Sequence, residues 1–310
     1  MRDIFLSRKV MEDRRNESLM RSSAGGENRA RTVLISTTIA AILVVSSVGF
    51  FVYDLSPSPP SPYLVSTLIG NASNPRPYYN TTNGYVSPNL WGLQYGGGNT
   101  TMYVYSNNSI HTIANFTNVG QKGVVLAYSS VHYTYDIPMS LQTALSSNLS
   151  SFVSFNVVSN SQQFSDVAYD LFLGQDGVQQ AEIMIFLFDS QPFTGTSITV
   201  PMEVSGQTLN TIWQFSYSTS ASGTFNDYEF IPTFYANTSG TYVVNISAFL
   251  LFLETKGLIS PSISVLKIGI GSEYGDTYST FNSLYNSFWM QTYLLLNGTK
   301  YQVVQPSGGS

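Results

Sequence analysis

The chain has 310 residues, of which 10% are charged, 43% are hydrophobic and 14% are aromatic. It contains no cysteine, which excludes disulfides, thiolate catalysis and cysteine-based metal sites. Beyond residue 31 it carries five basic and thirteen acidic residues, so we expect no nucleic-acid partner, because few cations remain to neutralise phosphates. The two histidines, His111 and His132, have no second obvious ligand nearby in the sequence. We expect structural or surface roles for them and no metal site.

The N-terminal part predicts a membrane anchor. Residues 1–31 form a basic leader that holds eight of the thirteen Lys and Arg residues. Residues 32–53 follow without a charge, and at about 1.5 Å per residue they can cross a hydrocarbon core of about 30 Å. Because positive charge favours the cytoplasmic side, we expect a single-pass signal-anchor with its N-terminus in the cytoplasm. A cleaved signal peptide, which would release a secreted domain, is the alternative.

A linker rich in Pro and Ser follows at residues 54–62, and its composition favours a semi-rigid spacer. Nine N-x-S/T sequons lie beyond the predicted anchor and are compatible with a glycosylated domain outside the cell. These sequons begin at Asn71, Asn80, Asn99, Asn107, Asn115, Asn148, Asn237, Asn245 and Asn297.

Residues 63–304 alternate short runs rich in Val, Ile, Tyr, Phe and Thr with clusters of Gly, Asn and Ser. This pattern predicts an all-β domain, a β-jelly roll sandwich of two antiparallel sheets, followed by a flexible tail at 305–310. One segment, Ile246–Gly257, instead predicts a short α-helix, because Asn245 is a suitable N-cap and a Lys-Gly pair ends the segment. The predicted strands include Thr101–Tyr105, Gly123–Tyr128, Phe152–Val158, Val167–Leu173, Ala181–Phe188, Ser197–Val204, Ile212–Ser218, Val265–Ile270 and Met290–Leu296.

Two glutamates lie in apolar runs, whereas most other acidic residues of the domain lie in polar segments. With the two-residue period of a strand, Glu182, Met184 and Phe186 share one face. Asp170 is a third carboxylate in a third apolar run.

Glu273 shares its strand face with Lys267, Gly269 and Gly271, and the two glycines leave room for a bulky group such as a sugar. A pair of carboxyl groups suits cleavage of a glycosidic bond, because one protonates the leaving oxygen and the other stabilises or attacks the anomeric carbon. Neighbouring carboxylates also raise one another's pKa, which keeps the acid protonated. Satisfied or rim-exposed strand glutamates are the structural alternative, because sequence spacing does not show that the two meet.

Aromatic side chains provide platforms on which pyranose rings can stack. Trp91 lies in the segment NLWG, whose turn-forming neighbours favour a position near an edge of the sandwich. For Trp213 and Trp289, a place in the core is the more common alternative.

With these residues the chain resembles glycoside hydrolase family 12, which contains endoglucanases and related enzymes with a compact β-jelly roll. The similarity extends from Gly84 to about Leu296. The segment NLWG resembles the family's motif for a glucose-binding subsite, which implies Asn89 and Trp91 as substrate contacts. The segment SDVAYDLFL resembles the strand whose aspartate supports the nucleophile, which implies that role for Asp170.

Two further motifs resemble the catalytic strands of the family. The segment AEIMIFL resembles the nucleophile strand, usually EIMIW, which implies Glu182 as nucleophile with Phe186 beside it. Met184 is retained from the motif and either lines the cleft or packs in the core. The segment IGSEYG resembles the acid/base strand and implies Glu273 in that role. Phe186 replaces the usual Trp, and the family's Pro-Ile-Gly loop appears only as PFTG at Pro192–Gly195. Cellulose, mixed-linkage glucan, xyloglucan and xylan therefore all remain open as substrates.

The leading hypothesis is a membrane-anchored, extracellular, retaining endo-β-1,4-glucanase that acts by double displacement as a monomer. Its partner is a β-linked polysaccharide, and no cofactor or metal is expected. The alternative is a non-catalytic carbohydrate-binding or cell-surface module on the same scaffold, which would bind glycans without either glutamate and without turnover. A purely structural adhesin would show no affinity for sugars.

Overall fold

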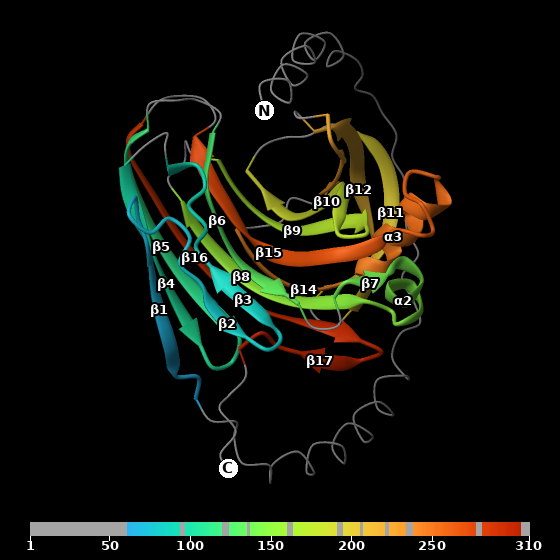
Figure 1. Ribbon diagram of the computed structural model, residues 1–310, viewed down its shortest axis with the longest axis horizontal. Coiled ribbons are helices and arrows are strands. Elements are labelled where there is room, and N and C mark those ends of the chain that lie inside the picture. Colours follow the sequence, from blue (N-terminus) through green and yellow to red (C-terminus); the bar gives the residue numbers. More distant parts are fainter. Residues whose placement is uncertain are drawn as a thin grey trace, which may run out of the picture. The chain divides into compact units, whose positions relative to one another are not determined.

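The computed structural model describes residues 61–304, except residues 94–96, 120–123, 135–136, 160–163, 191–194, 205–206, 221–222, 234–237 and 277–280 (Figure 1). The predicted leader, the predicted transmembrane segment at 32–53, most of the predicted linker and the predicted tail lie outside these residues. No helix within the described ranges is long and apolar enough to cross a membrane.

One layer of the domain, here named the front sheet, carries the candidate site. Its hydrogen-bonded strands follow the order β12 (Gln207–Thr219), β13 (Asn226–Pro232), β10 (Val178–Asp189), β9 (Phe164–Gln175), β15 (Ser264–Asp276), β6 (Val124–Tyr133), β3 (Gly84–Ser87) and β2 (Tyr79–Thr81). The short strand β7 (Met139–Ser140) also pairs with β15.

The second layer, here named the back sheet, follows the order β14 (Ser239–Val244), β8 (Ser150–Ser159), β16 (Phe281–Leu296), β5 (Ser109–Val119), β4 (Gly97–Tyr105) and β1 (Leu64–Gly70). Strand β17 (Thr299–Tyr301) pairs with the end of β16. Strand β11 (Thr196–Val204) pairs with both β12 and β14, so it joins the two layers into one hydrogen-bonded network.

The predicted all-β sandwich is confirmed, and each predicted strand overlaps an observed one. Two details of the prediction are wrong. The sheets are not wholly antiparallel, because β10 pairs with β13 in parallel. This pairing arises because the chain leaves β10, forms the β11–β12 hairpin and returns through β13 in the direction of β10. The described residues also contain two helices and not one.

The main core lies between the two sheets. On β9, the alternate residues Tyr169, Leu171 and Leu173 are fully buried and belong to one cluster with Phe155 and Met290 of the back sheet. Because successive strand residues point to opposite faces, the residues between them on β9 point away from this core. On the front sheet, the face toward the back sheet therefore contributes apolar burial to the main core. The opposite face can carry a functional site.

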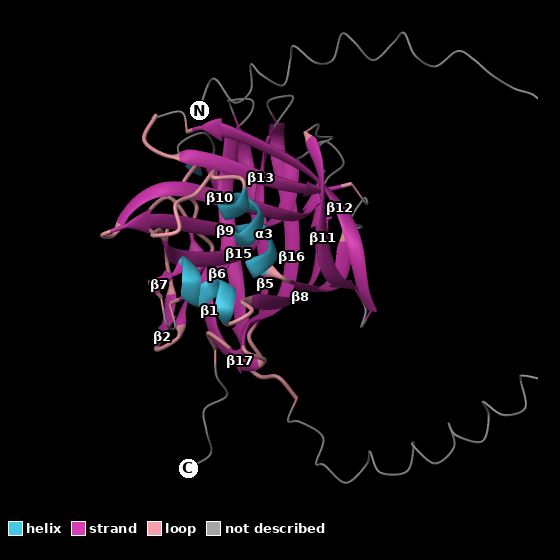
Figure 2. Ribbon diagram, turned by 90° about the vertical axis from the view of Figure 1, so that its right-hand side faces the viewer, coloured by secondary structure: helices cyan, strands magenta, loops and turns pink. Residues whose placement is uncertain are grey.

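The predicted helix is α3 (Ile246–Thr255), and it lies beside the unpredicted α2 (Leu141–Ser146) (Figure 2). Asn245 caps α3 as predicted, since its side-chain oxygen accepts a hydrogen bond from the Ala248 N–H at 3.2 Å. The helix ends at Thr255, two residues before the predicted end at Gly257, which adopts the left-handed φ of +68° typical of this position.

Candidate active site

The face of the front sheet that points away from the core carries the predicted catalytic carboxyl groups. Met184 on β10 lies opposite Asp170 on β9, and Asp170 lies opposite Gly269 on β15. Directly opposed residues share a face, and so do residues two apart on one strand. Glu182, Asp170 and Glu273, predicted on three separate apolar strands, therefore lie on one face of one sheet.

These three carboxyl groups are also within reach of one another's charge. Burial, followed by the charge of Glu273, raises the pKa of Asp170 to about 8. Burial, followed by the charge of Asp170, raises the pKa of Glu182 to about 8. Burial, followed by the charge of Glu182, raises the pKa of Glu273 to about 8. Since each ionisation makes the next harder, protons are shared within the group, and an ionised and a protonated carboxyl can coexist there.

Asp166 is a fourth carboxyl group, which the sequence analysis missed. It is fully buried, and its Oδ1 accepts a hydrogen bond from the backbone N–H of Glu273 at 3.0 Å. Burial, followed by the charges of Glu273 and Asp189, raises its pKa well above the ordinary value. The sequence could have predicted this position, because Asp166 stands four residues before Asp170, and strand residues an even number apart share a face.

Strand β6 adds an aromatic and an imidazole group to this face. Tyr128 lies opposite Glu273, and its hydroxyl donates a hydrogen bond to the backbone oxygen of Ala168 at 3.3 Å. His132 is 3% exposed, and its Nε2 is hydrogen-bonded to the Ser130 hydroxyl at 2.8 Å. Burial, followed by the charge of Lys267, lowers the pKa of His132 well below its ordinary value, so the ring is neutral.

The two glycines of β15 do not serve the purpose predicted for them. A Cβ atom at Gly269 would meet Nδ1 of His132 at 2.8 Å, and one at Gly271 would meet the backbone oxygen of Ser129 at 2.3 Å. The space above these glycines is therefore occupied by β6 and is not left open for a sugar. At Gly271 the backbone of β6 approaches closely, whereas at Gly269 the missing side chain leaves room for the imidazole of His132.

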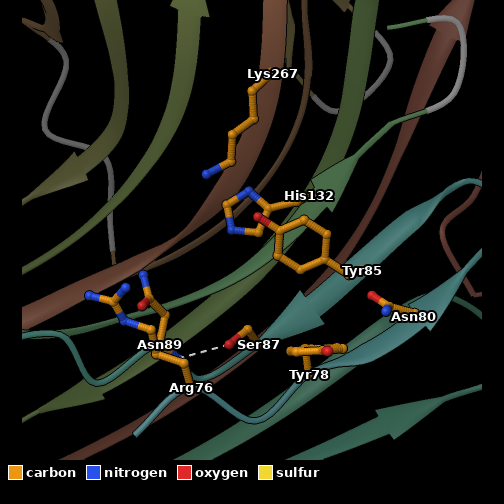
Figure 3. Close-up of a pocket in the computed structure, with 8 residues that line it drawn as sticks. All are labelled: Arg76, Tyr78, Asn80, Tyr85, Ser87, Asn89, His132 and Lys267. Carbon is orange, nitrogen blue, oxygen red and sulfur yellow. Dashed lines mark hydrogen bonds between the residues drawn. The ribbon is translucent and has the colours of Figure 1, made fainter.

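A cavity of about 440 Å³ adjoins this part of the face (Figure 3). It is lined by Arg76, Tyr78, Asn80, Tyr85, Ser87, Asn89, His132 and Lys267. Tyr78 is 63% exposed, so its ring is available to stack on a ligand, and the tyrosine Tyr85 stacks on His132 with ring centroids 4.5 Å apart. No group of three or more His, Asp or Glu residues in the described part of the chain is arranged to hold a metal ion. The cavity combines aromatic surface with hydrogen-bonding groups, as sugar binding requires.

The segment NLWG lies along β6, close to the carboxyl groups. The backbone oxygen of Asn89 accepts a hydrogen bond from the Tyr128 N–H at 3.1 Å, and the N–H of Gly92 donates to Leu126 at 3.1 Å. Asn89 lines the cavity, and Trp91 between these anchors is half-buried. Trp213, by contrast, is fully buried in the core. The structure thus brings Asn89 and Trp91 next to β6, whose Tyr128 lies opposite Glu273.

The other two predicted substrate contacts lie beside Glu182 on β10. Met184 is half-buried, whereas Phe186 is only 5% exposed and packs with Ala168 and Ile231. Phe186 therefore presents little of its ring to a ligand. Most of the predicted PFTG loop lies outside the described residues.

Comparison with known proteins identifies the family of the chain. The sequence profile described as glycosyl hydrolase family 12 matches residues 83–289. A native family 12 xyloglucanase from Bacillus licheniformis has a similar structure, with a TM-score of 0.55 and 20% sequence identity over 74% of this chain and 100% of that chain. Endoglucanase 3 from Trichoderma harzianum has a TM-score of 0.54 and 22% identity over 74% of this chain and 97% of that chain.

The xyloglucanase domain of NopAA from Sinorhizobium fredii, solved in complex with cellobiose, has a TM-score of 0.52 and 18% identity over 76% of this chain and 99% of that chain. A search of curated protein sequences found no significant match. At these identities the structural similarities establish the fold, whereas the profile match covers more than half of the sequence. The chain belongs to glycosyl hydrolase family 12 and is a glycoside hydrolase.

Proposed function

We propose that the protein is a retaining, endo-acting β-1,4-glycanase in which Glu182 is the nucleophile, Glu273 the acid/base and Asp170 the support of the nucleophile. One observation carries this assignment: Glu182, Asp170 and Glu273 share a sheet face, where the charge of Asp170 raises the pKa of Glu182 and the charge of Glu182 raises the pKa of Glu273. The substrate is a β-linked glucan or a related polysaccharide. Relatives described as endoglucanases and xyloglucanases support this substrate class.

The reaction proceeds in two displacements at one anomeric carbon. In the first, the carboxylate of Glu182 attacks the anomeric carbon while Glu273 gives its proton to the departing glycosidic oxygen. In the second, the Glu273 carboxylate takes a proton from water, whose oxygen attacks the same carbon and releases Glu182. The configuration at the anomeric carbon is retained because two inversions occur in sequence.

The test is the variant Glu182→Gln in the full-length protein, assayed by release of reducing ends from soluble β-glucan. We expect activity to be lost while circular dichroism stays unchanged, because the amide is similar in size but is not a nucleophile. Glu203→Gln on β11 is the matched control, since it changes a strand glutamate outside the candidate site and should keep full activity. Wild-type-like activity of Glu182→Gln would contradict the nucleophile assignment.

Two further measurements test the finer parts of this proposal. Proton NMR of a fresh digest should show the β-anomer of the new reducing end first, because a retaining enzyme forms it directly. The viscosity of a long glucan should fall before many reducing ends appear, since an endo-acting enzyme cuts within the chain. The α-anomer appearing first would refute retention.

We also propose that the catalytic domain lies outside the cell, attached by a signal-anchor at residues 32–53. The uncharged length of this segment and the basic residues before it support this location. Alkaline extraction of membranes should leave the protein in the pellet, and protease added to intact cells should degrade the β-domain. Recovery of the protein in the culture medium without its first 53 residues would favour the cleaved alternative.

A further inference from the structure

Lys267 is a cation among the carboxyl groups, and the proposed function assigns it no role. Among the basic residues in the described part of the chain, it is the one on a front-sheet strand. Arg76 precedes β2, Lys256 follows α3, and Lys300 lies on β17. Because Lys267 shares the face of Glu273, its side chain extends over the same surface as the candidate catalytic groups.

The register places Lys267 in line with the candidate nucleophile. Phe172 on β9 lies opposite Glu182 on one side and opposite Lys267 on the other. The ammonium of Lys267 lies 4.7 Å from the centroid of the Phe172 ring, which holds it above the sheet by a cation–π contact. In Figure 3 the ammonium of Lys267 ends beside the ring of His132, and both residues line the cavity. Lys267 and Glu182 therefore lie on the two strands that flank β9, and both are paired with Phe172.

A cation acts on one of the two catalytic candidates and not on the other. The charges of Asp170 and Asp227 raise the pKa of Glu182, and the charge of Lys267 opposes them. At Asp170 the charge of Lys267 likewise opposes that of Glu273. The charges that act on Glu273 are those of Glu182 and Asp189, and both raise its proton affinity. Burial lowers the pKa of Lys267, whereas the charges of Asp170 and Glu182 raise it. The cation and the two carboxylates thus stabilise one another at one end of the site.

A double displacement requires this kind of difference between its two carboxyl groups. One must be ionised and the other protonated in the free enzyme, although burial favours the protonated form of both. We propose that Lys267 is a positioning residue that keeps the proton on Glu273 by stabilising the ionised forms of Glu182 and Asp170. This inference rests on the proposed function and adds a determinant of its pH dependence.

The charged and titratable groups around Lys267 are Asp170 on β9, Glu182 on β10, His132 on β6 and Arg76 at the cavity wall, and Asp227 on β13 lies opposite Glu182. The test removes only the charge of Lys267, in the variant Lys267→Met, whose side chain keeps the aliphatic contact with the sheet. Lys267→Arg restores a cation. Lys300→Met is the matched control, because Lys300 also lies over an aromatic ring, with its ammonium 4.2 Å from the centroid of Tyr293.

The measurement is the pH dependence of covalent labelling by a 2-deoxy-2-fluoro-β-cellobioside with a dinitrophenolate leaving group. Labelling needs an ionised nucleophile but no proton from the acid/base, because this leaving group departs without protonation. An opposite charge at close range shifts a carboxyl pKa by about one unit or more. We expect the acid limb of Lys267→Met to move up by about one pH unit, and labelling below that limb to slow about tenfold.

Lys267→Arg and Lys300→Met should follow the wild-type profile. Lys267→Gln, a polar replacement, provides the same test if the Met variant does not fold by circular dichroism. The role of Lys267 would be overturned if the folded Met or Gln variant kept its acid limb at the wild-type pH. It would also be overturned if the acid limb of Lys267→Arg were shifted like that of Lys267→Met. A wild-type enzyme that is neither labelled nor active on any β-glycan would instead overturn the proposed function.

Discussion

The carboxyl cluster makes the stability of the protein depend on pH, and Asp170 offers the sharpest measure of this dependence. Its side chain is 6% exposed, and burial followed by the charge of Glu273 raises its pKa from 3.8 to about 8. A group whose pKa is raised by folding favours the folded state below its unfolded pKa, and this contribution is lost as pH rises through the folded pKa. The wild-type protein should therefore lose stability between about pH 4 and pH 8.

The size of this effect follows from linkage. Each unit of pKa shift corresponds to about 1.4 kcal/mol, so Asp170 titrating alone would cost the folded state about 6 kcal/mol by pH 8. Part of that cost belongs to the interaction with Glu273, which titrates in the same range. We expect Asp170→Asn, which cannot ionise, to be more stable than the wild type by about 3 kcal/mol at pH 8, and to differ little from it at pH 4.

The assay is equilibrium unfolding in urea at intervals from pH 4 to pH 9, with the free energy of unfolding extrapolated to zero denaturant. Asp176→Asn is the control. Asp176 is exposed in the turn between β9 and β10 at a left-handed φ of 51°, which asparagine also adopts readily. This variant should keep the pH dependence of the wild type. Free energies of Asp170→Asn that run parallel to those of the wild type over this range would refute the reasoning.

Two further predictions concern the scaffold. Asn245→Ala should lower the free energy of unfolding by about 1 kcal/mol, because α3 loses its N-cap, whereas Asn245→Asp should keep most of it; equal loss in both variants in urea unfolding would argue against the cap. Gly92→Ala should lower the free energy of unfolding by about 2 kcal/mol or more, because a Cβ there would meet the backbone oxygen of Val125 at 2.0 Å. The same variant should raise KM for β-glucan, since the contact would displace the turn that carries Trp91. Unchanged stability and KM in that variant would show that the turn adapts.

The strands and α3 were predictable because their signals are local. The alternation around Glu182 and the cap at Asn245 each depend on residues within a few positions of one another. Helix α2 was missed because six residues are too few for a helical period to show. The parallel pairing of β10 with β13 was also missed, since it depends on the path of the intervening hairpin and not on either strand's own residues.

The site was predictable only in part, for the same physical reason. Periodicity placed Glu182 and Glu273 each on one face of its own strand, but it contained no register between the strands. The structure adds that register, and with it the place of Asp166 beside the backbone of Glu273 and of His132 above Gly269. His132 looked isolated in the sequence because its neighbours come from other strands.

The register also explains why one sheet face can hold carboxyl groups of unequal character although burial acts on all of them alike. Lys267 stands two positions from Gly269 and meets Phe172, so its charge falls at the Glu182 end of the face. Glu273 stands six positions further along β15, and the charges that act on it, those of Glu182 and Asp189, are both acidic, whereas at Glu182 the charge of Lys267 opposes those of Asp170 and Asp227. A shift of β15 by two residues would keep every side chain on its face, yet it would move this cation along the sheet relative to Glu182. The difference between the two ends is therefore a property of strand pairing, which neither strand encodes alone.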